Sequence, residues 1–338
     1  MASDVLTTVE LQRLGEELGL DAVGGARVEA YAETERHILE RRARGLFGRM
    51  RFTMARPEVS CHPERLLAGA RTVVSAALCY WEPAPERQPG QGTLPRYARH
   101  DAYAALRERL DALGRALGGE YRVLVDSNDH VDREAAVRAG IAFYGKNTLA
   151  ITRRHGSWVV LGTLVTTAEL EPARPLETDC GSCRLCVDAC PTGALDEPGT
   201  LDATRCLSYW TLVPEPIPEP YRAPLGAQVC GCDICQEVCP WNRGVERRRS
   251  GREPDAAAHV DLVAWLEEEA ALADALELLY VPRNDPRWLR RNALVALGNA
   301  GAGTPRERRA LRRHADGDDA MLAEHAAWAL RRLGERCG

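Results

Sequence analysis

The stretch "CGSCRLCVDACPTGAL", residues 180–195, places four cysteines within 11 residues and a proline directly after the last of them. Its spacing, C-x2-C-x2-C-x3-C-P, is typical of bacterial ferredoxins that carry two [4Fe–4S] clusters. In that pattern three cysteines bind one cluster and the fourth binds the neighbouring cluster. Zinc sites more often show two separated C-x2-C pairs. The stretch therefore predicts a domain built around two iron–sulfur clusters.

A second cysteine run supplies most of the missing ligands. "CGCDICQEVCPW", residues 230–241, contains C-x2-C-x3-C-P, which is the same pattern without its first thiol, and Cys206 can supply that thiol from a distance. Cys230 is left over, and it is the alternative to Cys232, although only Cys232 has the two-residue spacing to Cys235. The predicted ligand sets are Cys180, Cys183, Cys186 and Cys239 for one cluster, and Cys190, Cys206, Cys232 and Cys235 for the other.

The rest of the composition agrees with reduced, metal-binding thiols. Nine of the 12 cysteines lie between Cys180 and Cys239. The N-terminus has no uninterrupted apolar stretch of the kind found in secretory signals, and no apolar run approaches the roughly 20 residues of a membrane helix. We therefore expect a cytoplasmic protein without a membrane partner, in which dense cysteines bind metal instead of forming disulfides.

The net charge of −5 does not by itself indicate a nucleic-acid-binding protein, but the basic residues are clustered. Such clusters either contact phosphates or form an ordinary solvated surface, and the sequence leaves both open. The basic stretches are "ERHILERRARGLFGRMRF" (35–52), "RGVERRRSGR" (243–252) and "PRNDPRWLRRN" (282–292).

Strand and helix patterns alternate in the first half, which predicts an α/β domain over residues 1–170. Residues 1–56 read as helical, with a break at Gly24-Gly25. The predicted strands cover 70–81, 121–129 and 157–167, and the predicted helices cover 101–119 and 131–141.

Two further domains are expected. The cysteines define a ferredoxin-like domain over residues 171–245. The remaining residues, 246–338, are helical, and "LRRNALVALGNAG" (289–301) aligns with "LAEHAAWALRRLG" (322–334) at an offset of 33 residues. That period predicts a short HEAT-like helical repeat.

Segments along nearly the whole chain resemble epoxyqueuosine reductase, the cobalamin-dependent family of queuosine biosynthesis. The resemblance is carried by "CGSCRLCVDACPTGALDEPGTLDATRCLSYWT" and "GCDICQEVCPWNRG", and by "GLFGRMRF", "HPERLLAGARTVV", "PRYAR", "VDREAAVRAGIAFYGKNTLAI" and "GSWVVLG" in the same order. It implies a cobalamin-binding α/β (α+β) core related to reductive dehalogenases, two [4Fe–4S] clusters, and a helical repeat that contacts the anticodon stem-loop of tRNA. It also implies an external electron donor such as flavodoxin or ferredoxin, and we expect a monomer.

The resemblance gives Asp132 the role of the acid that protonates the opened epoxide. An alkoxide leaving group needs such an acid, and a carboxyl that stays protonated near neutral pH must be partly desolvated. Asp126 and Asp129 are nearby rivals, and from its position alone Asp132 reads as a carboxylate at a helix N-terminus. Candidate cobalamin contacts by position are Lys146, Asn147, Gly156 and Ser157, for which ordinary loop roles are the alternative.

The chain also departs from the family pattern in the half that should hold cobalamin and substrate. Ala102-Tyr103-Ala104 stands where the family usually has Asp-Tyr-His, Thr163 stands where a Glu is frequent, and Cys61 replaces a common Arg. Two alternatives therefore stay open. One is a related corrinoid and iron–sulfur reductase that acts on a different substrate, and the other is a non-catalytic iron–sulfur protein.

Overall fold

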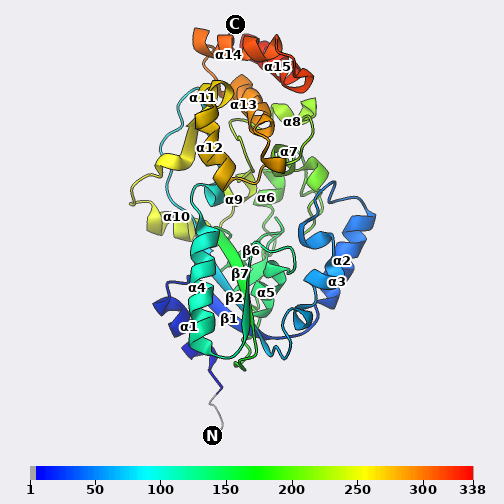
Figure 1. Cartoon of the computed structure of the whole chain (residues 1–338), viewed down its shortest axis with the longest axis vertical. Helices are drawn as coiled ribbons and strands as arrows, with labels where there is room; N and C mark the ends of the chain where they lie inside the picture. The colour runs from blue at the N-terminus through cyan, green and yellow to red at the C-terminus, as the bar shows by residue number, and fades with distance from the viewer. Residues whose placement is uncertain (1–4, 338) are drawn as a thin grey trace.

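The computed structural model describes residues 5–337, and its first half is built on one four-stranded sheet (Figure 1). The strand order is β1-β2-β7-β4, and every neighbouring pair is antiparallel. The two long central strands are almost wholly buried because helices cover both faces. The strands are β1 (Ala22–Arg27), β2 (Thr72–Cys79), β4 (Tyr121–Val125) and β7 (Val159–Thr166).

Helices α1 (Thr8–Glu17) and α4 (Ala102–Leu117) pack on one face of the sheet, and α5 (Asp132–Arg138) packs on the other (Figure 1). The α4 face is a core of leucines and valines, with Leu106, Leu110 and Leu113 fully buried. The α5 face is built from smaller side chains, among them Ala77 and Ala136. Small residues bring the backbone of α5 close to the sheet.

The prediction that residues 1–56 are helical is wrong for residues 22–27, which form the edge strand β1. A Cβ on Gly24 would lie 2.1 Å from the carbonyl oxygen of Ala139, at the end of α5. Gly24 therefore marks a point on the strand at which another part of the backbone passes closely, which glycine permits within a strand. The predicted strands near 70–81, 121–129 and 157–167 are confirmed as β2, β4 and β7.

The remaining elements of the first half are short and lie outside the sheet. In Figure 1, α2 and α3 form a separate blue layer beside α5. These elements are α2 (Ala32–Ala43), η1 (Phe52–Met54), α3 (Pro57–Ser60), η2 (Pro63–Arg65), β3 (Gln91–Thr93), η3 (Arg96–Ala98), β5 (Ala142–Tyr144) and β6 (Ala150–Thr152).

Residues 171–245, which we call the cluster segment, contain only short helices. Two of them, α6 (Leu185–Asp188) and α9 (Ile234–Glu237), pack together, and each lies within one of the two cysteine runs. The others are η4 (Ala203–Arg205), α7 (Leu207–Leu212), α8 (Glu219–Arg222) and, across the end of the segment, α10 (Arg243–Arg249). With so little regular structure, the loops need other cross-links to hold their shape.

The C-terminal part is helical, as expected. The two aligned sequence stretches form α13 (Arg287–Ala300) and α15 (Ala320–Cys337), and these helices pack against each other. Their assignment to the HEAT class stays a prediction. The other elements are η5 (Ala256–Ala258), β8 (His259–Asp261), α11 (Leu262–Glu267), α12 (Glu269–Leu278), η6 (Pro282–Asn284) and α14 (Pro305–Ala315). No described helix is both long and apolar enough to cross a membrane.

One of the basic stretches holds the helical part onto the cluster segment. Arg291 is fully buried, and its guanidinium donates to the carbonyl oxygens of Val213 at 2.7 Å and Trp210 at 2.9 Å. The neighbouring Asn292 donates to the carbonyl oxygens of Thr211 and Val229. These bonds satisfy carbonyl groups that α7 leaves free at its end. Residues 291 and 292 are therefore structural and are not part of a solvated basic patch.

Candidate functional site

Four predicted cluster ligands line one cavity. A cavity of about 180 Å³ is lined by the thiols of Cys180, Cys183, Cys186 and Cys239. Burial, followed by the negative charge of Cys180, raises the pKa of both the Cys186 and the Cys239 thiol. Thiolate ligands on several sides of one small space are what a cubane cluster requires, so this donor set fits a [4Fe–4S] cluster.

The second predicted set also gathers in one place. Burial raises the pKa of Cys206, and the nearby Cys190 raises it further. Burial, together with the nearby Cys206, raises the pKa of Cys232 to about 12. The pKa of Cys235 is raised by burial and then by Cys232 and Cys206. Each thiol therefore lies within electrostatic range of the next. Across residues 5–337, no three His, Cys, Asp or Glu side chains form a group that could hold a single metal ion.

The two thiol sets are neighbours. Cys186 of the first set packs in one apolar cluster with Cys190 and Cys235 of the second. Asn147 lines the first cavity and donates to the carbonyl oxygen of Cys235. Adjacent clusters of this kind would pass electrons from one to the other.

Cys230 differs from the second thiol set in its electrostatic surroundings, although Cys232 packs against the same core. It is 2% exposed within the core that joins the cluster segment to the C-terminal helices, and it forms a hydrogen bond with Tyr97. Burial raises the pKa of Cys230 to about 12, and no other thiol contributes to this rise. Its position therefore favours Cys232 as the ligand.

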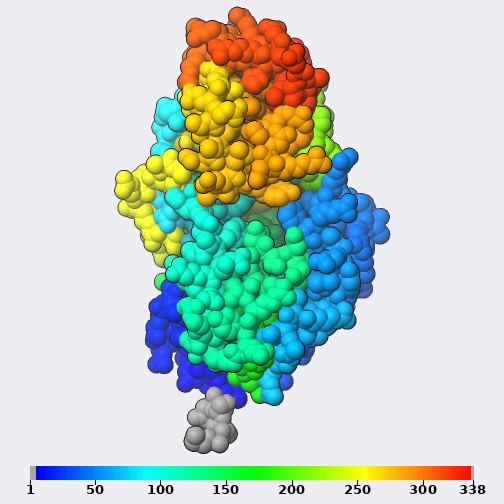
Figure 2. Space-filling model, viewed as in Figure 1, coloured from blue at the N-terminus to red at the C-terminus, as the bar shows by residue number. Residues whose placement is uncertain are grey.

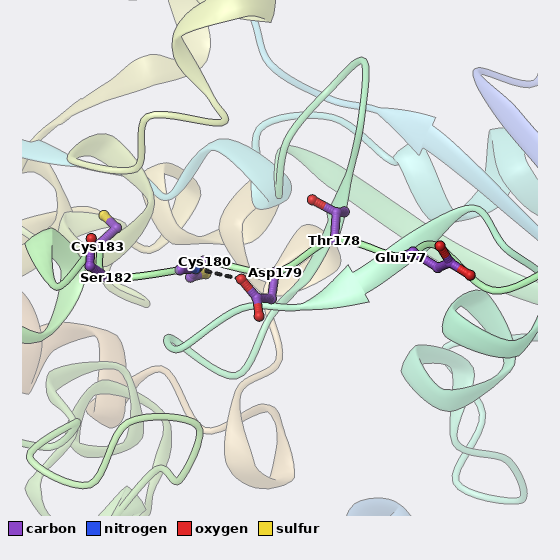
Figure 3. Close-up of a pocket in the computed structure, with 7 residues that line it drawn as sticks. Glu177, Thr178, Asp179, Cys180, Ser182 and Cys183 are labelled. Carbon is purple, nitrogen blue, oxygen red and sulfur yellow. Dashed lines mark hydrogen bonds between the residues drawn. The ribbon is translucent and has the colours of Figure 1, made fainter.

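The first thiol set is open to solvent on one side. Residues 177–183 line a hollow on the surface, with Cys180 and Cys183 among them (Figure 3). Asp179 accepts a hydrogen bond of 2.6 Å from the backbone N–H of Gly181, which fixes the turn between these two cysteines. Leu185 lies nearby in the sequence and is 44% exposed.

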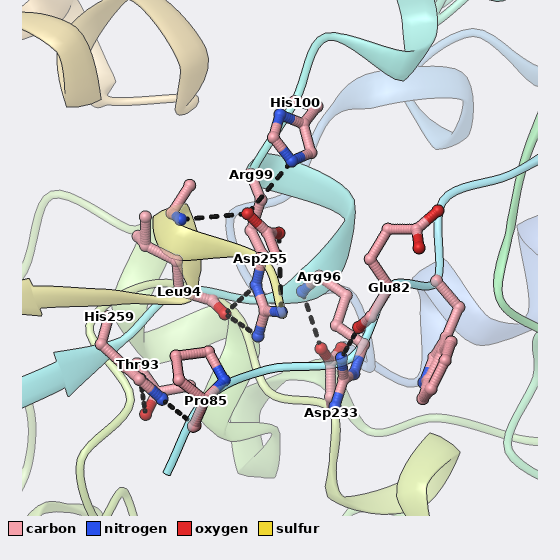
Figure 4. A network of polar contacts seen from close by, with 12 residues as sticks. Glu82, Pro85, Thr93, Leu94, Arg96, Arg99, His100, Asp233, Asp255 and His259 are labelled. Atoms are coloured by element: carbon pink, nitrogen blue, oxygen red, sulfur yellow. Dashed lines mark hydrogen bonds and ion pairs between the residues drawn. The ribbon is translucent and has the colours of Figure 1, made fainter. Parts of the chain in front are cut away.

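The "PRYAR" segment connects the cluster segment to the sheet domain. The backbone N–H of Arg96 donates to Asp233 at 3.0 Å, within the second cysteine run (Figure 4). Its guanidinium lies over the rings of Trp81 and Trp158, at 5.1 and 5.5 Å from the ring centroids. In the same network, the side chain of Arg99 donates to the carbonyl oxygen of Leu94 (Figure 4).

The four residues predicted as cobalamin contacts all lie against the cluster segment. Lys146 donates to the carbonyl oxygens of Gly181 at 2.6 Å and Cys183 at 2.9 Å, and Asn147 lines the same cavity. A Cβ on Gly156 would lie 1.9 Å from the side-chain oxygen of Asn242. The buried Ser157 bonds to Gln236 and Asn242. Their cobalamin role stays a prediction, and the bonds in the structure hold the cysteine loops.

Asp132 is the first residue of α5, and it points to the middle of the sheet. Its carboxylate accepts a hydrogen bond of 2.6 Å from Thr163, a fully buried residue of β7. Burial raises the pKa of Asp132 to about 7, although the bond from Thr163 opposes this rise. Ser75, which pairs with Thr163 across the sheet, has a buried hydroxyl without a hydrogen-bond partner in the described part of the chain. A half-buried carboxyl with this pKa can hold a proton at neutral pH and release it.

The two rival aspartates have different surroundings. Asp129 accepts hydrogen bonds from Arg122 at 2.9 Å and Arg56 at 3.2 Å, so two guanidinium groups compensate its charge. Asp126 is exposed and has a positive φ of 51°. Asp132 is the one of the three that is both poorly solvated and without an arginine partner.

Unpartnered polar atoms surround the Asp132 loop. His130 is fully buried, and neither of its ring nitrogens has a hydrogen-bond partner among residues 5–337. Its ring centroid lies 5.6 Å from that of Tyr31, whose buried hydroxyl also has no partner among these residues. Burial lowers the pKa of His130 to about 4, so the ring is neutral at physiological pH. Buried polar groups normally have hydrogen-bond partners, so the surroundings of the Asp132 loop are unusual in this respect.

Two tyrosines link Asp132 electrostatically to the second cysteine run. Burial raises the pKa of Tyr103 to about 12, and the charges of Asp126 and Asp132 add to this rise. Tyr97, in turn, is electrostatically linked to Tyr103, Asp233 and Cys230. Figure 2 shows a hollow bordered by blue N-terminal residues, cyan-to-green residues of the sheet domain and orange C-terminal helices.

The positions that depart from the family pattern do not share one role. Thr163 holds Asp132. Cys61 is fully buried against Tyr31 and Ile38, and burial raises its pKa to about 11, so it is a core residue. Ala104 is exposed in the first turn of α4. No sequence pattern indicates the contact between the rings of Tyr31 and His130, because about a hundred residues separate them.

Two family models match the chain. The model of the "Epoxyqueuosine reductase QueG, DUF1730" family matches residues 61–127, and the model of the "4Fe-4S double cluster binding domain" matches residues 179–242. The second match covers all eight predicted cluster ligands.

Relatives match over most of the chain. The epoxyqueuosine reductase of Escherichia coli K12 is 35% identical and covers 97% of this chain and 89% of its own length. That of Xanthomonas campestris is 33% identical, with coverage of 96% and 95%. The solved structure of the Streptococcus thermophilus enzyme superposes with a TM-score of 0.85 at 28% identity, covering 97% of this chain and 90% of its own. The chain therefore belongs to the epoxyqueuosine reductase family.

Proposed function

We propose that this chain reduces the epoxide of epoxyqueuosine, in the wobble position of tRNA, to the alkene of queuosine. The reaction breaks two C–O bonds, forms a C=C bond, consumes two electrons and two protons, and releases water. The observation that carries the proposal is Asp132, a proton-holding carboxyl in a domain joined to two sets of four thiols. A relative of this chain was crystallised with an epoxyqueuosine-modified tRNA-Tyr stem loop.

Asp132 would supply the proton for the leaving oxygen. With a pKa of about 7, a large fraction of its carboxyl is protonated at neutral pH. Thr163 fixes the oxygen Oδ1, which leaves Oδ2 free to carry the proton towards the substrate. One relative's structure is described as having its catalytic aspartate loop swung out of the active site, which supports a mobile acid at this position.

The eight thiols would carry the electrons. Cys180, Cys183, Cys186 and Cys239 would hold the outer cluster, beside the surface hollow where an external flavodoxin or ferredoxin can approach (Figure 3). Cys190, Cys206, Cys232 and Cys235 would hold the inner cluster, which lies on the side of Tyr97 and Asp233.

Cobalamin would bind beside Asp132 and Tyr103. The fit rests on these two half-buried polar side chains, which lie within electrostatic range of each other. These groups can bond to the amide side chains of a corrin. When bound, cobalamin would supply the low-valent metal that reduces the epoxide. Tyr103 would line the same space from the start of α4.

The test is conversion of an epoxyqueuosine-containing stem loop by anaerobically purified, cobalamin-supplemented protein, with titanium(III) citrate as the electron source. We expect a product nucleoside that has lost one oxygen, detected by mass spectrometry. Asp132→Asn should abolish conversion, whereas Asp129→Asn, at a neighbouring aspartate that is ion-paired, should retain it.

The same preparation separates the alternatives. A bound corrinoid without conversion would indicate a reductase for another substrate. Clusters without any corrinoid absorption band would indicate an iron–sulfur protein that does not catalyse this reaction. Full activity of Asp132→Asn would remove the acid role and leave the substrate assignment standing.

A further inference from the structure

Two exposed aromatic rings bridge the N-terminal and C-terminal parts of the chain. Phe52 is 43% exposed and lies in η1, and Tyr280 is 60% exposed and follows α12. Their ring centroids lie 5.9 Å apart in an edge-to-face arrangement. A pair formed only for packing would be buried, because aromatic side chains gain most of their stabilisation from burial. Here much of both rings faces solvent.

The backbone beside this pair is strained. Among residues 5–337, five non-glycine residues have a positive φ, and three of these are Phe52 at 33°, Arg283 at 59° and Asn284 at 51°. A bulky side chain such as phenylalanine rarely adopts this conformation. Backbone strain of this kind is typical of functional sites, where it presents a side chain in a particular direction.

The charges around the pair suit an anionic partner. Arg51 and Arg283 are exposed, and within the described part of the chain neither guanidinium has a carboxylate partner. Most other arginines nearby are neutralised. Arg49 pairs with Glu215, and Arg287 pairs with Asp285 and Asp319. Among the residues that the structure describes, Arg51 and Arg283 are therefore two arginines without a carboxylate partner, and they flank two exposed aromatic rings.

The residue after Phe52 is connected to the Asp132 loop by two hydrogen bonds through Ser60. Ser60 is fully buried, and its hydroxyl donates to the carbonyl oxygen of Thr53 at 2.8 Å. The carbonyl oxygen of Ser60 accepts a bond of 3.2 Å from the N–H of Val131, the residue before Asp132. The blue and orange surfaces that border the hollow in Figure 2 come from the two parts of the chain that carry Phe52 and Tyr280.

We propose that Phe52 and Tyr280 form a stacking surface for an unpaired base of the substrate RNA, and that Arg51 and Arg283 contact its flanking phosphates. The inference rests on the proposed function, because it assigns a binding surface for the same substrate. Exposed aromatic rings and unpaired arginines are the combination by which proteins bind single-stranded nucleotides. A loop nucleotide beside the modified base would be held here while the modified base enters the hollow.

Binding of an unmodified anticodon stem loop, followed by fluorescence anisotropy, tests this without requiring turnover. We expect Phe52→Ala and Tyr280→Ala each to weaken Kd by about tenfold, within the range measured for loss of one stacked base. Tyr280→Phe keeps the aromatic face and should bind like the wild type. Tyr280→Leu keeps an apolar contact with Phe52 but removes that face, so it should bind like Tyr280→Ala.

Matched controls separate stacking from charge and from stability. Leu39→Ala removes an exposed apolar side chain on α2, 44% exposed, and should leave Kd unchanged. Arg51→Gln should lower the slope of log K against log salt by about 0.7, as expected for one lost phosphate contact on a single strand, whereas the aromatic variants should leave that slope unchanged. Arg13→Gln on α1 is the charge control.

If Tyr280→Leu and Phe52→Ala lower Tm but bind RNA as tightly as the wild type, the rings only join the two parts of the chain and the proposal is wrong. If the wild type does not reduce epoxyqueuosine but the variants lose binding as expected, the proposed function is wrong and the RNA-stacking inference is supported. If the wild type reduces epoxyqueuosine but all aromatic variants bind RNA like the wild type, the proposed function is supported and the inference is wrong.

Discussion

Replacing Thr163 by valine should move the pH dependence of the reaction upward. Thr163 donates to Asp132 at 2.6 Å, and this bond stabilises the charged carboxylate and so lowers its pKa. Valine has nearly the same shape and no hydroxyl, so the substitution removes the bond without opening a cavity in the sheet. The direction follows from the chemistry: without the bond the carboxylate is less stable, and the pKa rises.

The magnitude follows from the energy of the bond. A hydrogen bond to a charged group contributes about 1.5–3 kcal/mol. Since one pKa unit corresponds to about 1.4 kcal/mol, the pKa of Asp132 should rise by about one to two from its value near 7. An acid acts only when protonated, so the wild-type rate should fall as the pH rises through 7. In Thr163→Val the fall should begin about one to two pH units later.

Single-turnover reduction of an epoxyqueuosine stem loop at saturating enzyme, from pH 6 to pH 9.5, measures this midpoint. Thr163→Ser keeps the hydroxyl and should restore the wild-type profile. Thr166→Val removes another buried hydroxyl from the same strand, one that donates to the carbonyl oxygen of Glu120, and should leave the midpoint in place. A midpoint that is unmoved or lowered in Thr163→Val would refute the reasoning.

Three further outcomes follow from the structure. Because the pKa of Asp132 is raised, the folded state loses stability as the pH rises from the usual carboxyl range through 7. The difference between the folded-state pKa and the ordinary pKa corresponds to about 4 kcal/mol. Since the side chain has some solvent contact, we expect a loss on the order of 2 kcal/mol. Asp132→Asn should therefore raise Tm at pH 8.5 and have little effect near pH 4, measured by anaerobic calorimetry. Cys230→Ser should retain about eight irons per chain, whereas Cys232→Ser should lose part of them, measured by iron analysis. Gly24→Val should lower Tm because its side chain would meet the carbonyl oxygen of Ala139, and an unchanged Tm would show that β1 tolerates the contact.

The sequence is most informative where chemistry fixes the spacing of residues. A cluster needs thiolates at set intervals along a tight loop, so the pattern at 180–190 is enough by itself to indicate ligands for two clusters. The strands are predictable for a similar reason, because apolar runs such as 70–81 form the centre of the sheet. The edge strand β1 is not apparent in the sequence because its two glycines read as a break. The structure explains Gly24, which meets a helix end about 115 residues further along the chain.

The site around Asp132 is only partly predictable. Its acid role follows from resemblance, and its raised pKa depends on burial that no local pattern shows. Thr163 stands out in the sequence only as a departure from the family, although it is the residue that bonds to Asp132. Lys146 and Asn147 are predicted to contact cobalamin from their position along the chain. In the structure they lie at the first thiol cavity, because β5 and β6 pack beside the cysteine loop. Contacts between distant segments decide such roles.

Two hydrogen bonds fix Asp132, one at its carboxylate and one at the backbone of the preceding residue. From the sheet, Thr163 fixes one carboxylate oxygen through a rigid central strand. From the N-terminal layer, the bond from Val131 to Ser60 fixes the backbone just before α5, and Ser60 in turn bonds to Thr53, next to the exposed ring of Phe52. The first contact lowers the proton affinity that burial has raised, because it stabilises the charged carboxylate. The second sets where the acid stands, because it acts on the backbone and reaches the surface at which we propose the RNA binds. A substrate that stacks on Phe52 would therefore meet an acid whose position depends on the same segment.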